Sequence, residues 1–143
     1  MKKQIFTVAA ALAFTALAPA QSHAQQSLQV NIPFAFQAGS TSMPAGEYRV
    51  WRSFAGNESA QQIQRTDSSA SVIVLTNNAD SRVNDYDAKL IFHCYGRECF
   101  LYEIWDGNGH GSITVGSRRE KELSQTRTEN ELAVVSLPLA VRP

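Results

Sequence analysis

Residues 89–105 read KLIFHCYGRECFLYEIW and decide the fold that we expect. Two runs of aliphatic and aromatic side chains flank a glycine-arginine pair, an order that suits a two-residue type II′ turn. The stretch therefore predicts a β-hairpin. In the register that this turn sets, Cys94 faces Cys99 in a non-hydrogen-bonded pair, where α-carbons lie about 4.5 Å apart. A disulfide can span that distance, so we expect a bridge between the two cysteines.

Both faces of this hairpin are apolar. An unbroken register puts Leu90, Phe92, Leu101 and Trp105 on one face, and Ile91, Phe100, Tyr102 and Ile104 on the other. A strand pair that is covered on both sides belongs at the centre of a sandwich or barrel.

The rest of the chain predicts a mainly β protein. Further strands are expected at residues 29–37, 47–53, 61–65, 72–76, 112–115 and 132–137, with a polar loop over 77–87. Pro33 places the first strand at an edge, and Pro138 stops the last. Ser117 and Glu120 at capping-box spacing predict a short helix over 118–125. We expect a small antiparallel sandwich or partly open barrel of about seven or eight strands, with one short helix near the C-terminus.

The N-terminal segment has the order of a signal peptide. Two lysines precede an apolar stretch over residues 5–18, and small residues lead to Ala24. The stretch is shorter than the roughly 20 residues that a membrane-spanning helix needs. We expect cleavage after Ala24, with Ala20 as the alternative, and a single β-rich domain over 25–143. Export to the periplasm or the medium would favour the disulfide.

The charge balance argues against two classes of partner. Removal of residues 1–24 from the 143-residue chain leaves 119 residues with 11 basic and 13 acidic side chains, a net charge of −2. Such a balance gives no support for binding to nucleic acid or to an anionic membrane surface. No later stretch is apolar for long enough to cross a membrane, so we expect no span after cleavage. The partner and the oligomeric state stay open.

One loop resembles the start of a calcium site. Asp106, Asn108 and His110 alternate with glycines, as oxygen ligands do in such a loop. The calcium pattern would require Asp or Asn at the fifth position and Glu at the twelfth, where this chain has His110 and Ser117. A hairpin turn that uses its glycines for positive φ is therefore the preferred interpretation, and we expect no metal or cofactor.

No catalytic set stands out. His93 and His110 are the histidines that remain after cleavage, and no residue is spaced to identify a triad with either. His93 faces Phe100 across the hairpin, so a partly buried, hydrogen-bonded side chain is expected. Two carboxylate pairs could serve glycoside hydrolysis if their separation were right, although both suit solvated surface: Asp85 with Asp87, and Glu103 with Asp106. The charged run 118–122 is interpreted as a water-facing helix surface.

Aromatic side chains are the remaining hint of a ligand site. Six of them could stack on a sugar or line an apolar pocket, although such residues are more often core: Tyr48, Trp51, Tyr86, Tyr95, Tyr102 and Trp105. Trp51, Tyr102 and Trp105 are the candidates for ligand binding. We expect a non-enzymatic envelope or secreted interaction protein. A carrier or binding domain for a small apolar or sugar ligand is the first alternative, and a small hydrolase using Asp or Glu with His110 is the second.

Four segments carry a resemblance to a family. The chain resembles a group of small exported bacterial β-rich proteins of unknown function, at residues 32–36 (IPFAF), 44–48 (PAGEY), 92–96 and 100–105. The resemblance covers most of the chain after residue 24 and implies a shared β fold, with no known catalytic or binding residues to carry over. The cysteine pair departs from that group, which favours a local structural bridge over a shared redox site.

Overall fold

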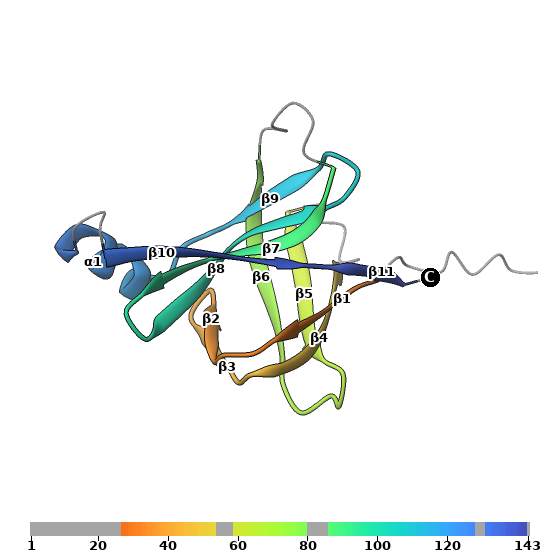
Figure 1. Cartoon of the computed structure of the whole chain (residues 1–143), viewed down its shortest axis with the longest axis horizontal. Helices are drawn as coiled ribbons and strands as arrows, with labels where there is room; N and C mark the ends of the chain where they lie inside the picture. The colour runs from red at the N-terminus through yellow and green to blue at the C-terminus, as the bar shows by residue number, and fades with distance from the viewer. Residues whose placement is uncertain (1–26, 54–58, 80–85, 128–130, 143) are drawn as a thin grey trace, which may run out of the picture.

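The computed structural model describes residues 27–53, 59–79, 86–127 and 131–142, without the side chains of 141 and 142. The expected signal peptide lies outside these ranges. Within them the protein is mainly β, with eleven strands and one helix (Figure 1). They are β1 (Ser27–Ile32), β2 (Phe36–Ala38), β3 (Thr41–Met43), β4 (Gly46–Arg52), β5 (Ala60–Arg65), β6 (Ser71–Ala79), β7 (Ala88–Tyr95), β8 (Glu98–Asp106), β9 (Gly111–Thr114), α1 (Arg118–Thr126), β10 (Leu132–Pro138) and β11 (Ala140–Arg142).

The strands form one mixed sheet that is not closed. Its order is β10-β7-β8-β9-β6-β5-β4-β1-β11, and the two terminal members are consecutive in the chain on either side of Leu139. This C-terminal run crosses the molecule, pairing with β7 first and with β1 afterwards (Figure 1). The short hairpin β2–β3 joins β8 through one parallel pair, Gln37 with Phe100. The architecture is thus a partly open barrel, as expected, with one parallel contact in an otherwise antiparallel sheet.

The central hairpin has the expected register at its turn. Cys94 pairs with Cys99, and the two form a disulfide with their α-carbons 4.0 Å apart. Gly96 has a φ of +65°, whereas Arg97 does not have positive φ, which is the φ pattern of a type II′ turn. The expected hairpin is confirmed.

A β-bulge changes the faces of this hairpin beyond the turn. Phe92 pairs with Leu101 but Ile91 pairs with Glu103, so Tyr102 is an extra residue on β8. Every later side chain on β8 therefore points to the face opposite to the one expected, and Ile104 rather than Trp105 joins the core. The hydroxyl of Thr114 donates to the carbonyl of Leu101 at 2.6 Å and to that of Tyr102 at 3.3 Å. This side chain pairs the carbonyls that the bulge removes from the ladder.

Three further expectations are corrected. The strand expected over 29–37 is split, because Pro33 cannot donate to a ladder and β1 ends before it; β1 also has neighbours on both sides, so it is not an edge. The expected loop over 77–87 begins later, because residues 77–79 pair with β9. Pro138 does not stop the last strand but pairs with Lys89, and the chain continues into β11.

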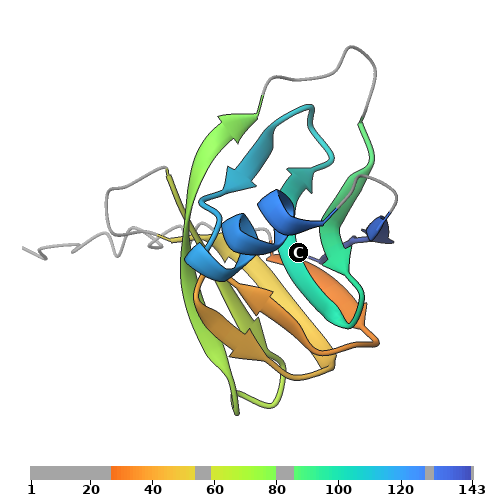
Figure 2. The ribbon, with the colours of Figure 1, turned by 90° about the vertical axis from the view of Figure 1, so that its left-hand side faces the viewer.

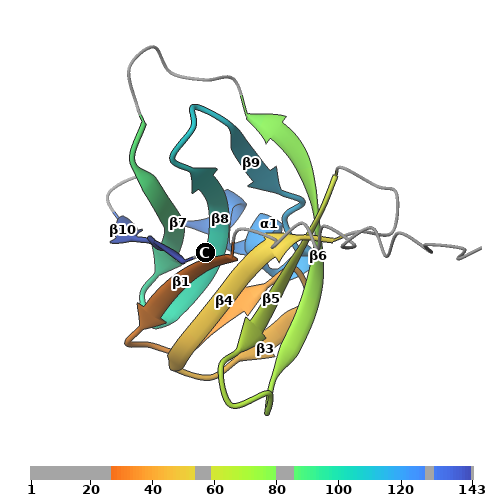
Figure 3. The same ribbon diagram turned by 90° about the vertical axis from the view of Figure 1, so that its right-hand side faces the viewer.

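The core lies between the two halves of the curved sheet. Figure 3 shows β1, β4, β5 and β6 fanned side by side, with β7, β8 and β9 completing the wall. Phe36 contacts Tyr48 and Phe92 edge to face, with ring centroids 5.3 and 5.4 Å apart, and Phe34 contacts Phe92 in the same way at 5.2 Å. The first three of these side chains are at most 2 % exposed. These aromatic contacts fix the relative position of β2, β4 and β7.

The helix α1 covers the outer face of the hairpin near its turn (Figure 2). Ser117 caps it by accepting a hydrogen bond from the backbone N–H of Glu120, as the capping box predicts. Leu123 is 5 % exposed and packs with Tyr95 and Phe100 in a second apolar cluster. Leu123 therefore docks the helix on the sheet.

The charged run on α1 is only partly a water-facing surface. Arg119 is exposed and forms two hydrogen bonds with the carboxylate of Glu98, at 2.6 and 3.0 Å. Glu120, by contrast, is 8 % exposed, so the expectation that residues 118–122 all face solvent is wrong at this position. Burial raises the pKa of the Glu120 carboxyl. The reason is helical geometry, since Glu120 lies three residues before Leu123 on the docked side.

Candidate functional site

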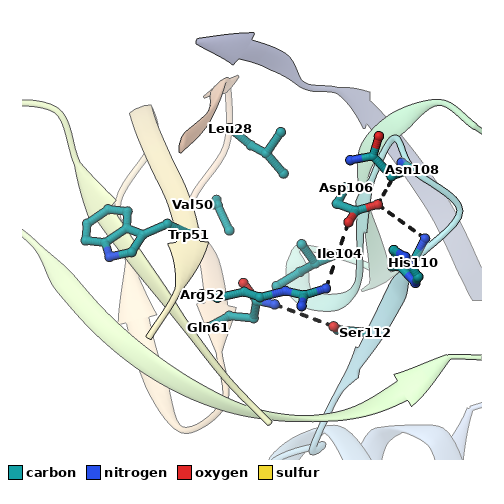
Figure 4. A pocket seen from close by; sticks show the side chains of 10 residues that line it. All are labelled: Leu28, Val50, Trp51, Arg52, Gln61, Ile104, Asp106, Asn108, His110 and Ser112. Carbon is teal, nitrogen blue, oxygen red and sulfur yellow. Dashed lines mark hydrogen bonds and ion pairs between the residues drawn. The ribbon is translucent and has the colours of Figure 1, made fainter. Parts of the chain in front are cut away.

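A pocket of about 340 Å³ opens at the end of the barrel opposite to the helix (Figure 4). It lies where β4 and β8 end and where β5, β9 and β1 begin. Its lining combines apolar and polar side chains: Leu28, Val50, Trp51, Arg52, Gln61, Ile104, Asp106, Asn108, His110 and Ser112.

Three aliphatic side chains form the apolar part of the pocket. Leu28, Val50 and Ile104 belong to the main core and are 8 %, 0 % and 3 % exposed. They come from three different strands, and Ile104 lies here only because the bulge at Tyr102 reverses the faces of β8. The pocket therefore continues into the hydrophobic core of the barrel.

A buried polar pair lies beside this apolar part. The amide of Gln61 donates to the hydroxyl of Ser112 across 3.5 Å, and the two side chains are 6 % and 9 % exposed. Their strands, β5 and β9, are both neighbours of β6 and not of each other, so the contact bridges the interior. A hydrogen bond of this length is weak, so both groups can exchange it for a stronger partner.

The loop that follows β8 forms the rim of the pocket. One carboxylate oxygen of Asp106 accepts hydrogen bonds from the backbone N–H groups of Asn108 and His110, at 2.7 and 3.2 Å. The other oxygen lies 3.9 Å from a guanidinium nitrogen of Arg52 (Figure 4). The rim thus places a carboxylate and a guanidinium side by side, with the carboxylate held by the loop backbone.

The glycine-rich loop is a hairpin turn. Gly107 and Gly109 have φ values of +82° and +81°, a conformation that glycine adopts without steric cost. Asp106, Asn108 and His110, the residues considered as metal ligands, all line the pocket. Within the described residues, no group of three or more His, Cys, Asp or Glu side chains is close enough to hold a metal ion.

The three aromatic residues considered for ligand binding are not brought together. Trp51 belongs to the pocket lining, but its ring points away from the polar side chains of the rim (Figure 4). Tyr102 stacks on His93 with ring centroids 3.7 Å apart, on the outer face of the sheet. Trp105 is 3 % exposed and packs against Gly111, where a Cβ would lie 2.7 Å from its ring. The other aromatic candidates are divided between core, helix contact and surface: Tyr48, Tyr95 and Tyr86.

Of the two predicted carboxylate pairs, Glu103 and Asp106 do not converge on one cleft. Alternation along β8 puts Glu103 on the outer face, where its carboxylate accepts from the indole N–H of Trp105 at 2.7 Å. Asp106 lies on the inner face with Ile104 and lines the pocket. Asp85 is outside the described residues. The hydrogen bond between Asp106 and His110 uses the backbone N–H of the histidine, so it does not orient the imidazole.

His93 is half-buried on the outer face, opposite Phe100 as expected. Burial lowers the pKa of its imidazole, and the nearby carboxylate of Glu103 partly opposes that shift. It lies on β7 across the sheet from the pocket side, so the two histidines belong to different faces of the molecule.

Sequence reasoning missed three polar residues of the pocket. Arg52, Gln61 and Ser112 carry no motif, and the sequence pattern predicts only that each lies in a strand. A signal existed for Arg52, because alternation along β4 places it on the same face as the fully buried Tyr48 and Val50. A charged side chain that ends a buried strand face marks the mouth of a barrel. The other two follow from the tertiary arrangement alone.

Comparisons with protein-family models, with curated proteins and with solved structures find no match to this chain. In the described part of the chain, no helix has the length and apolar character needed to cross a membrane.

Proposed function

We propose that this is an exported, non-enzymatic binding protein that takes up a small molecule with an apolar part and a polar part. The pocket between the ends of β4 and β8 carries this proposal, because its lining passes from buried aliphatic side chains to a charged rim. A ligand of mixed polarity matches that gradient.

The dimensions of the pocket suit such a ligand. Small-molecule sites occupy about 300 to 1,000 Å³ and combine a mostly apolar lining with a few placed polar groups. A pocket of about 340 Å³ lies in the lower part of that range. The end of a β-barrel is also a common position for such a site, since the strands there diverge and leave room between their side chains.

The sequence supports export. The lysines, apolar stretch and small residues over 1–24 form the pattern of a cleavable signal. A disulfide between Cys94 and Cys99 persists most readily in an oxidising compartment outside the cytosol. A binding protein in that setting would meet its ligand directly.

A ligand panel tests the proposal. The purified protein is titrated calorimetrically with hexanoate, hexanol, benzoate and glucose, and at least one should bind. Ser112→Phe fills the pocket and should abolish that binding. Ile113→Phe is the matched control, because Ile113 is the next residue on β9 and points to the opposite face. Ile113→Phe should bind like the unmodified protein.

A second pocket variant keeps the proposal testable if Ser112→Phe disturbs folding. Asn108→Trp places a large side chain on the exposed rim, where the core does not constrain it, and should also weaken binding. Unimpaired binding by both pocket variants would contradict the proposal, as would a complete lack of binding across the panel.

A further inference from the structure

We infer that the ligand of this pocket is a small organic acid, with its carboxylate bound by Arg52 and its apolar body directed at Leu28, Val50 and Ile104. This inference rests on the proposed function and deepens it by assigning a chemical class to the ligand. Its basis is a difference in hydrogen bonding between the two charged groups of the rim, Arg52 and Asp106.

Arg52 has unused hydrogen-bonding capacity. Its side chain is 58 % exposed, and its contact with Asp106 is a single nitrogen–oxygen distance of 3.9 Å, the outer limit of an ion pair. A guanidinium group carries five N–H donors in a planar fork that matches a carboxylate bidentately. Among the residues that the structure describes, most of these donors therefore remain available on the pocket side of β4.

Asp106, in contrast, is already committed to the loop. Its Oδ1 atom accepts from two backbone N–H groups, those of Asn108 and His110, and its side chain is 28 % exposed. The two N–H dipoles and the neighbouring guanidinium offset much of its negative charge. Its Oδ2 atom lies 3.9 Å from the Arg52 guanidinium, so an incoming ammonium group at that oxygen would meet a like charge beside it.

The apolar part of the pocket lies at a fixed depth below this anchor. Val50 precedes Arg52 by two residues on the same face of β4, and Ile104 precedes Asp106 in the same way on β8. Two residues of a strand span about 7 Å. An acid with a short aliphatic or aromatic body would therefore reach the aliphatic side chains while its carboxylate stays at Arg52.

Three ligands with the same six-carbon body separate the effect of charge from that of apolar contact. Hexanoate, hexanol and hexylamine are titrated into the purified protein by calorimetry. Hexanoate should bind about ten-fold more tightly than hexanol, the equivalent of about 1.4 kcal/mol for a charge-assisted hydrogen bond. Hexylamine should bind least well.

Two charge variants test the role of each group. Arg52→Gln should reduce hexanoate affinity to that of hexanol and leave hexanol unchanged. Arg49→Gln is the matched control, because Arg49 lies on the same strand with its side chain on the opposite face. Asp106→Asn should raise hexanoate affinity several-fold, since the amide oxygen can still accept from the two backbone N–H groups while the negative charge is lost.

The outcomes distinguish this inference from the proposed function. Equal affinity for hexanoate and hexanol, with both blocked by Ser112→Phe, would overturn the organic-acid assignment and leave the binding proposal intact. Tightest binding of hexylamine, or equal losses from Arg49→Gln and Arg52→Gln, would also overturn the assignment. If none of these three ligands binds, and neither benzoate nor glucose binds, both proposals fail together.

Discussion

The two ends of β8 differ in how the protein uses them. At the start of the strand, the disulfide crosslinks the tight turn, and the docked helix covers Tyr95 and Phe100. At its end, eight residues later, the strand runs into a glycine-rich loop beside a pocket that reaches the core. The two ends lie roughly 27 Å apart at about 3.4 Å per residue.

This difference separates the stabilising contacts at one end of the barrel from a ligand-sized pocket at the other. A crosslink and a helix stabilise one end, so that the other end need not be filled with side chains. The pocket end relies instead on polar contacts that exchange easily, namely the pairs Gln61–Ser112 and Arg52–Asp106. We call the disulfide turn with α1 the closed end, and the pocket with its rim the open end. If this division is correct, variants at the closed end should change stability, and variants at the open end should change ligand binding.

The largest effect is expected from the helix anchor. Leu123→Ala should lower the free energy of unfolding by about 2 to 4 kcal/mol, because it removes a buried side chain from the contact with Tyr95 and Phe100. A helix of nine residues is not stable alone, so α1 should also undock. Urea titration followed by circular dichroism measures both effects. Lys121→Ala, on the exposed side, is the control, and a loss of ligand binding in Leu123→Ala would show that the two ends are coupled.

The disulfide should have the next largest effect. Replacement of both cysteines by alanine should cost about 2 kcal/mol, because a bridge that closes a short loop removes little entropy from the unfolded chain. Alanine avoids burying a hydroxyl at Cys94, which is 5 % exposed in the core. Reduction of the unmodified protein should cause the same loss in urea titration and should not affect the double variant. A complete failure to fold would mean that the bridge is a framework and not a local crosslink.

A smaller, local effect is expected at the rim. Asp106→Ala removes the acceptor of two backbone N–H groups and should cost about 1 to 2 kcal/mol, whereas Asp106→Asn should be close to neutral. Hydrogen exchange at the amides of Asn108 and His110 should become about ten-fold faster in the alanine variant. Equal exchange in both variants would indicate that the glycines alone define the loop.

The smallest effect expected is a loss of stability at acid pH through His93, which precedes the disulfide-bonded Cys94 on β7. Burial holds the pKa of His93 below its ordinary value of 6.5, so the unfolded state binds the proton more readily. Stability from this group is therefore full above pH 6.5 and falls as the pH decreases from 6.5 toward the lower pKa of the folded state. His93→Gln should flatten that part of the profile of unfolding free energy against pH. An unchanged slope would assign the acid sensitivity to other groups.

The closed end was predictable from the sequence because its determinants are local. A glycine at the turn, two cysteines that flank it symmetrically and a capping pair at Ser117 and Glu120 each specify structure within a few residues. Leu123 was also identifiable, as the apolar side chain in an otherwise polar helix. Such signals act without knowledge of the remainder of the fold.

The open end was predictable only in part, in its glycine-rich loop, because the face that β8 presents to the pocket depends on a tertiary feature. The bulge at Tyr102 reverses the faces of the last residues of β8, and no turn or breaker residue marks it in the sequence. Trp105 was therefore assigned to the face that Ile104 occupies. The carbonyls at the bulge are paired by Thr114 from β9, a partner that only the assembled sheet supplies.

The strand count differed for a similar reason. The expected strands were found, but the one over 29–37 was divided at Pro33, and the short strands β3 and β11 were not anticipated. Thr41 and Ser42 in that strand are exposed, so its sequence lacks the alternation that marks a half-buried strand. The strand β3 is therefore specified by its pairing with β2 and not by its own sequence pattern.

Two-dimensional amide NMR during titration with hexanoate tests the central claim most directly, because it locates the ligand on the fold. The account predicts that the perturbed amides cluster at Arg52, Gln61 and residues 104–112, while those of α1 and of the disulfide turn stay unchanged. Perturbations centred on α1 and residues 94–99, or none at saturating hexanoate, would contradict it.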